Sequence, residues 1–81
     1  MPVIFRYKGF KFFFFSNEGI PKEPSHVRIR KGEKLAKFWV KPLVTLVQSY
    51  GMSGKELTEL ANVITEHSTQ IEEAWNEYFG N

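Results

Sequence analysis

The stretch FKFFFF, from Phe10 to Phe15, places five phenylalanines within six positions. A strand with one solvated face needs an apolar residue only at every second position, because successive side chains point to opposite faces. We therefore assign Phe10, Phe12 and Phe14 to the core face of a strand. Phe13 and Phe15 then point to the other face, where an aromatic patch commonly marks a contact surface.

The residues around this stretch predict three further strands. Residues 3–7 are rich in strand formers, and the dipeptide KG at residues 8–9 supplies a turn before Phe10. Residues 26–30 and 34–40 form a second pair that turns at Lys31-Gly32. Residues 16–25, with two prolines, read as a loop between the pairs. We expect two hairpins that together make a four-stranded antiparallel sheet.

The hydrophobic period changes in the C-terminal half. Apolar residues spaced i, i+3, i+4, i+7 between Leu43 and Tyr50 predict a first helix, which Pro42 begins and Gly51 ends. Ser53 and Glu56 fit a capping box at the start of a second helix, residues 54–79. The chain is thus expected to be one α+β domain, residues 1–81, with both helices packed on one face of the sheet.

The expected second helix is long for the domain. At 1.5 Å per residue it would span roughly 39 Å, whereas a compact domain of this length measures about 30 Å. The helix either breaks near residues 66–69, where helix propensity is weak, or carries its end beyond the domain. We favour the protruding end, which predicts a homodimer that is formed through Trp75, Tyr78 and Phe79.

Composition excludes several classes of site. The chain has no cysteine and two histidines, so we expect neither a metal site nor a cofactor. Without a long apolar run, we expect no signal peptide and no membrane span, and hence a cytoplasmic protein. Charge is divided unevenly: residues 1–41 carry a net +7 and residues 42–81 a net −5. This division predicts either an external partner or an acidic half that lies near the basic one.

Strand alternation gathers cations and rings on the face that points away from the helices. The residues that we expect to bind on this face are Arg6, Lys11, Phe13, Phe15, His26, Arg28, Arg30, Lys37 and Trp39. Three interpretations stay open. The rings are covered by a second subunit, as in a purely structural homodimer, or by the loop of residues 16–25; or the face is a nucleic-acid interface with stacked bases; or it docks an acidic partner protein.

A catalytic alternative centres on the start of the third strand. A metal-independent ribonuclease needs an acid, a base and cations for the phosphorane charge. His26 and Glu23 would supply base and acid, and Arg28 with Arg30 the positive charge. The spacing is not specific, because any basic strand beside an acidic loop has it. We therefore expect a binding module rather than an enzyme.

Several separated blocks together resemble a known family. The blocks FFFFSNEG, EPSHVRI, AKFWV, ELTEL and EAWNEYFG are similar to the small bacterial family called domain of unknown function 4160. The resemblance implies a stand-alone protein without an established activity, whose gene context looks like a toxin–antitoxin pair. The family commonly has HVHV where this chain has HVRI, so His26 matches and Arg28 replaces the second histidine. That departure disfavours a two-histidine metal site and favours an anion-binding role.

Overall fold

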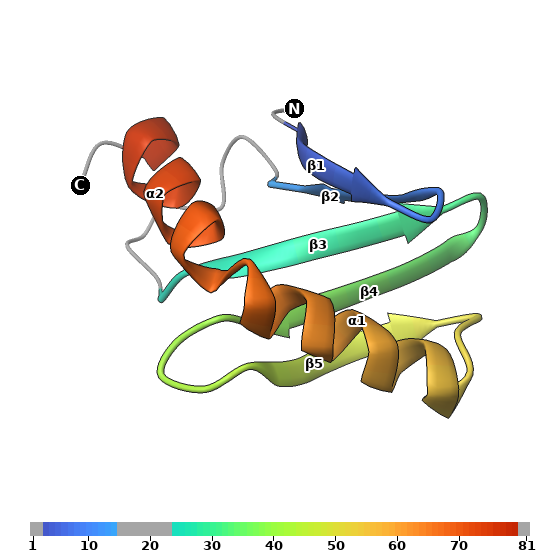
Figure 1. Ribbon diagram of the computed structural model, residues 1–81. Helices are drawn as coiled ribbons and strands as arrows, with labels where there is room; N and C mark the ends of the chain where they lie inside the picture. Colours follow the sequence, from blue (N-terminus) through green and yellow to red (C-terminus); the bar gives the residue numbers. More distant parts are fainter. Residues whose placement is uncertain (1–2, 15–23, 80–81) are drawn as a thin grey trace.

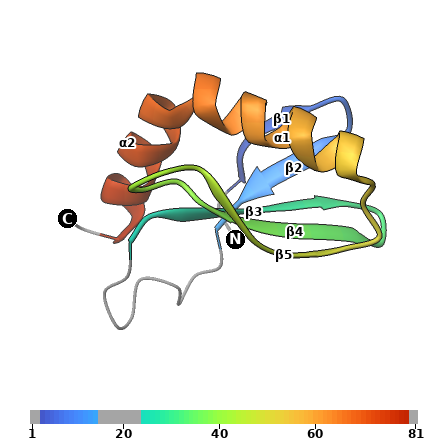
Figure 2. The same ribbon diagram turned by 90° about the horizontal axis from the view of Figure 1, so that it is seen from below.

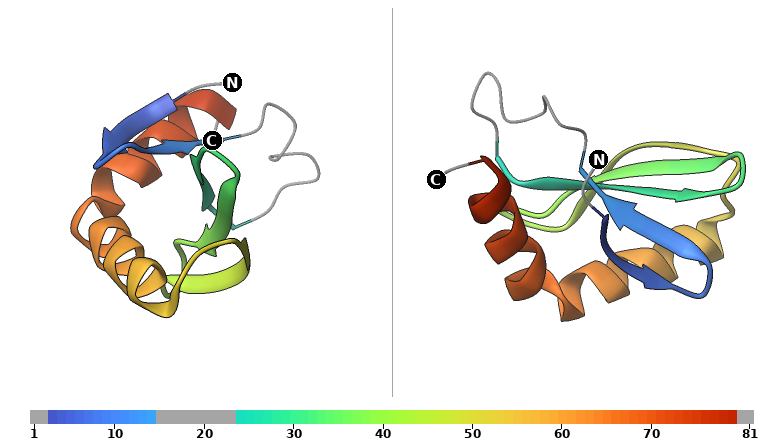
Figure 3. Two further views of the ribbon diagram at one scale, coloured as in Figure 1. Left: turned by 90° about the vertical axis from the view of Figure 1, so that its right-hand side faces the viewer. Right: turned by 90° about the horizontal axis from the view of Figure 1, so that it is seen from above.

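The computed structural model describes residues 3–14 and 24–79. In chain order the elements are β1 (Val3–Tyr7), β2 (Phe10–Phe13), β3 (His26–Lys31), β4 (Lys34–Trp39), β5 (Thr45–Tyr50), α1 (Gly54–Glu66) and α2 (Ser68–Phe79). The strands form one antiparallel sheet in the order β1-β2-β3-β4-β5 (Figure 1). Both helices cover the same face of the sheet (Figure 2), and seen end-on the strands form an arc whose open side the helices close (Figure 3).

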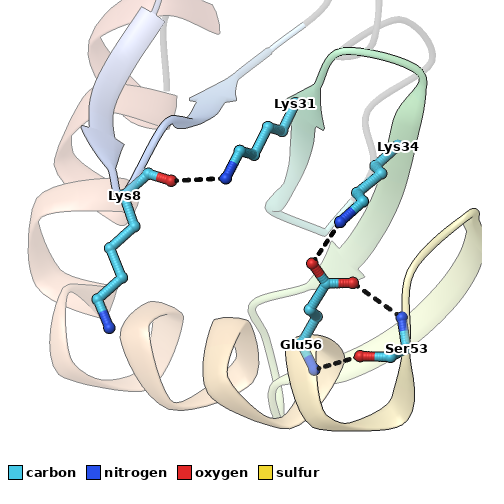
Figure 4. Close-up of polar contacts among 5 residues, drawn as sticks. All are labelled: Lys8, Lys31, Lys34, Ser53 and Glu56. Atoms are coloured by element: carbon cyan, nitrogen blue, oxygen red, sulfur yellow. Dashed lines mark hydrogen bonds and ion pairs between the residues drawn. The ribbon is translucent and has the colours of Figure 1, made fainter.

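Two tight turns join the strands of the β1–β2 and β3–β4 hairpins. Lys8 and Gly9 have positive φ angles of 49° and 83°, as a type I′ turn requires at both central positions. In the second hairpin the turn lies at Gly32 and Glu33, one residue later than expected, with Gly32 at φ 61°. The Lys31 Nζ donates to the backbone oxygen of Lys8 at 3.2 Å, so the two turns are bonded to each other (Figure 4).

The alternation predicted for the phenylalanine stretch is confirmed. Phe10, Phe12 and Phe14 are buried and belong to one core cluster between the sheet and the helices. From the helices, Leu60 and Ile64 of α1 reach the same cluster. The cluster is completed by Val63 of α1, by Ile71 and Trp75 of α2, and by Val27, Ile29, Ala36, Phe38 and Val40 from the sheet region.

The sheet has five strands, so the prediction of four was wrong. Residues 45–50, expected in a helix, form β5 and pair with β4. The spacing of Leu43, Leu46 and Tyr50 fits a helical face, but all three side chains are exposed, so no such face is buried. The β-branched Thr45 and Val47 lie beside them and favour a strand.

The last helix breaks instead of protruding, which corrects our preferred expectation. α1 ends at Glu66 with His67 as its C-cap, whose backbone φ and ψ are −110° and 18°, and α2 begins at Ser68. The His67 ring nitrogen Nδ1 lies 2.9 Å from the Val63 carbonyl oxygen at this point. The change of direction lets Trp75 pack into the core of its own chain. Neither helix in the described part of the chain is long and apolar enough to cross a membrane.

A bulge changes the face of the first two residues of β1. Val3 lies opposite Phe13, whereas Phe5 lies opposite Phe12, so one extra residue, Ile4, lies between the two pairs. Val3 therefore shares the face of Phe13 and is exposed, while Ile4 packs against the core. Strict alternation along residues 3–7 would place these two side chains the other way round.

Candidate binding face

The strand register brings four cations together on the face opposite the helices, which we call the outer face. Lys11 lies directly opposite Arg30, and Phe13 lies opposite Arg28. In the next pair of strands Arg28 lies opposite Lys37. Directly opposite residues share a face and lie about 5 Å apart at Cβ. The cations Lys11, Arg28, Arg30 and Lys37 therefore form one cluster, and Arg6 extends it because it lies opposite Lys11.

A hollow on the outer face lies beside this cluster. It encloses about 280 Å³ and is lined by Phe13, Arg28, Ile29, Arg30, Leu35, Ala36, Gln48, Ser49 and Tyr50. Ile29 and Ala36 belong to the core on the other face, so their backbone forms the floor. None of the described lining residues is acidic, and Tyr50 is 67% exposed at the rim. We call this hollow the outer cleft.

Helix carboxylates pair with lysines at the turn end of the sheet, not with the cluster. The Lys34 ammonium donates to Glu56 at 2.6 Å, and Glu56 also completes the capping box with Ser53 (Figure 4). The Lys8 ammonium and the Tyr7 hydroxyl donate to Glu59 at 3.1 and 2.6 Å. Within residues 3–14 and 24–79, Lys11, Arg30 and Lys37 make no ion pair. Among the described residues, the ion pairs of the acidic half thus lie at the turn end of the sheet and not on the outer face.

These bonds shift the titration of both glutamates. The hydrogen bond from Lys34 is the largest cause that lowers the pKa of Glu56 from its ordinary value of 4.5. The hydrogen bond from Tyr7 is the largest cause that lowers the pKa of Glu59, and the hydrogen bond from Lys8 is the second. The same bond to Glu59 raises the pKa of Tyr7.

A pH prediction follows from these lowered values. A carboxyl group whose folded pKa is depressed stabilises the fold fully above its unfolded pKa, and loses that contribution as the pH falls through the folded value. We expect the Tm to fall as the pH drops below 4.5, and to fall less steeply in Glu59→Gln. Thermal unfolding followed by circular dichroism measures both. Glu66→Gln, at an exposed helix position, is the control, and equal pH slopes for the two variants would contradict the assignment.

The structure corrects two expectations about exposed site residues. Phe13 does point to the outer face but is only 3% exposed, with the Lys11 Nζ 5.7 Å from its ring centroid. His26 is 0% exposed and packs between Trp39 and Trp75, at ring-centroid distances of 5.3 and 4.8 Å. Neither ring presents a face to a partner, because side chains of the same chain cover it.

The other residues expected on this face differ in how far they are exposed. Trp39 is half-buried beneath Lys37, whose Nζ lies 5.3 Å from the ring centroid. Arg30 is exposed, and its Nε donates to the Gly32 carbonyl at 3.2 Å. Phe15 and Glu23 lie outside the described residues.

The proposed ribonuclease centre is not supported by this geometry. A general base must reach the proton that it removes, and the ring of His26 is enclosed, with Nδ1 at 3.3 Å from the Pro24 carbonyl oxygen. Among the described residues no group of three or more histidine and acidic side chains is placed to hold a metal ion.

Of the three residues expected to form a dimer contact, one is buried, one is partly buried and one is exposed. Trp75 is buried against Phe14 and Phe79, at ring-centroid distances of 5.2 and 4.3 Å, and it cannot enter a neighbouring subunit without leaving its own core. Phe79 packs partly against the core, whereas Tyr78 is exposed. The homodimer itself stays a prediction.

Sequence reasoning missed the residues that β5 adds to the outer cleft. Gln48 and Tyr50 line it opposite Lys37 and Leu35, and both were assigned to a helix. The β-branched residues of the run TLVQSY were the signal that could have placed them in a strand.

Comparison with known proteins identifies a family. A family model described as "Domain of unknown function (DUF4160)" matches residues 9–76, which is most of the chain. Searches of curated proteins and of solved structures found no match.

Proposed function

The chain belongs to the DUF4160 family, for which no function is described, and we propose that it is a binding module whose outer face docks an acidic partner protein. One observation carries the proposal: the cluster of Lys11, Arg28, Arg30 and Lys37 adjoins a cleft that is lined by both apolar and basic side chains and by no described acidic residue. The partner would be the other member of the toxin–antitoxin-like pair that the family resemblance implies.

The composition of the cleft supports a protein partner. Arginine and tyrosine are enriched where proteins bind each other, and Arg28, Arg30 and Tyr50 line the cleft beside the apolar Leu35. Its volume of about 280 Å³ lies just below the roughly 300–1,000 Å³ typical of small-molecule sites. A few side chains of a partner fit such a hollow better than a cofactor does.

The outer face supports nucleic acid less well. Single-stranded nucleic acids bind through bases that stack on exposed rings, together with cations that follow the backbone. Of the described rings on this face, Phe13 is buried and Trp39 is half-buried beneath Lys37. Tyr50 alone in that set is well exposed, so the face offers charge without a row of stacking platforms.

A peptide titration tests the proposal. The probe is a fluorescein-labelled peptide of alternating glutamate and valine, six residues long like β5. We expect Arg30→Glu to weaken binding about tenfold, because it removes a charged hydrogen-bond donor and adds repulsion. Lys55→Glu makes the same change of charge on α1 and should leave the Kd within about twofold. Fluorescence anisotropy at low salt measures both, since salt screens exposed charges.

Two outcomes would contradict the proposal. Equal losses in Arg30→Glu and Lys55→Glu would mean that net charge, and not the outer face, attracts the probe. Tighter binding of a labelled oligothymidylate of equal charge, lost in Arg30→Glu, would show that the face is a nucleic-acid interface.

A further inference from the structure

The free edge of β5 lacks most of the features that protect edge strands. β5 is the last strand of the sheet, all six of its residues are exposed, and its sequence TLVQSY has no charged residue and no proline. Natural sheets usually protect an exposed edge with charge, proline or a covering element. Both edge strands contain a bulge, at Ile4 in β1 and at Val47 in β5, but the opposite edge strand, β1, also carries the charged Arg6. In the described part of the chain, no backbone hydrogen bond from another element reaches the outer edge of β5.

The register identifies a backbone group that faces this edge. Lys31 and Lys34 flank a two-residue turn, so they form a hydrogen-bonded pair, and such pairs alternate with non-hydrogen-bonded pairs along the strands. Lys37 therefore directs its N–H and C=O away from β3 and toward Gln48 of β5. The backbone N–H and C=O of Gln48 therefore point back at β4. Those of the next residue, Ser49, point to the free edge.

We propose that this edge receives an extended segment of the acidic partner as a further strand of the sheet. The inference rests on the proposed function and names the mode of binding. An added strand forms hydrogen bonds with the free backbone N–H and C=O groups of β5, which a docked helix or loop would leave without partners. Alternation then sets its chemistry: acidic residues lie on the outer face, on the side of Lys37 and Tyr50, and apolar residues lie beside Leu46, on the side of Phe38.

Charge favours this occupant over a second copy of the chain. Two copies joined through β5 by a twofold axis would present the same surface to each other, and would bring their clusters of cations onto one continuous face. Lys37 lies one strand in from β5, so the two clusters would repel each other across the joined β5 strands, whereas a segment with carboxylates on that face is attracted.

Proline at position 49 tests the edge directly. Ser49→Pro removes the N–H that faces the edge, and proline is tolerated in edge strands where that group faces solvent. Ser49→Ala is the reference, because it removes the same hydroxyl and keeps the N–H. We expect the alternating glutamate–valine peptide to bind Ser49→Pro about tenfold more weakly than Ser49→Ala. In the unmodified chain, saturating peptide should slow hydrogen exchange of the Ser49 amide, as followed by NMR.

The outcomes separate this inference from the proposed function. If Arg30→Glu weakens binding while Ser49→Pro and Ser49→Ala bind equally, the edge is not the site and the basic outer face still is. Unchanged exchange at Ser49 under saturating peptide would overturn the inference in the same way. A concentration-dependent dimer that Ser49→Pro abolishes would replace the acidic partner with a second copy. If Arg30→Glu and Ser49→Pro both bind like their references, both proposals fail.

Discussion

Trp75→Ala lowers the free energy of unfolding by about 3–5 kcal/mol, the range for removing a large buried aromatic side chain. The indole packs against Phe14, His26 and Phe79, so its loss leaves a cavity where the sheet meets α2. A domain of this length is stable by roughly 4–12 kcal/mol in total. Urea denaturation followed by circular dichroism should therefore show a variant that is largely unfolded or close to it.

Tyr78→Ala provides the control, because Tyr78 lies on the same helix and is exposed. We expect it to change the free energy of unfolding by less than about 1 kcal/mol. Similar losses for both variants would contradict the burial of Trp75. So would a Trp75→Ala protein that keeps its stability but loses a dimer, since the dimer contact expected from the sequence would then be correct.

Ile29→Ala has the second large effect, a loss of about 2–5 kcal/mol. Ile29 is fully buried at the centre of β3, between Phe12 of β2 and Ala36 of β4. Leu35→Ala is the matched control: it also truncates an aliphatic side chain in the sheet, but Leu35 points to the outer face and is exposed. It should cost less than about 1 kcal/mol. Urea denaturation of the two variants compares the core face of the sheet with its outer face. Equal losses of unfolding free energy would mean that our assignment of side chains to these faces is wrong.

The sequence predicts well those elements whose local signals and packing agree. Alternate phenylalanines gave the core face of β2, and the Ser53–Glu56 capping box gave the start of α1. Turn residues placed both tight hairpins to within one residue. The arginines of β3 also lie on the face that alternation predicts. Burial of the other face fixes the register, since a shift by one residue would turn every side chain of the strand to the opposite face.

The features that failed depend on contacts between distant parts of the chain. β5 combines a helical spacing of apolar residues with the β-branched Thr45 and Val47, and its pairing with β4 decides between the two signals. The burial of His26 arises because the chain turns at His67 and returns Trp75 to the end of β3. No spacing in β3 reveals that contact. The same return of α2 removes Trp75 from the surface that the sequence had suggested for a dimer.

The most direct test of the basic outer face is a map of the amides that respond to an acidic ligand. Uniformly ¹⁵N-labelled protein is titrated with the alternating glutamate–valine peptide, and backbone shifts are followed by NMR. We predict that the largest shifts fall on Arg28, Arg30, Lys37 and Tyr50, with little change at exposed helix positions such as Lys55 and Glu73. Shifts centred on α1 or α2, or spread evenly over all exposed lysines, would contradict a docking site on the outer face of the sheet.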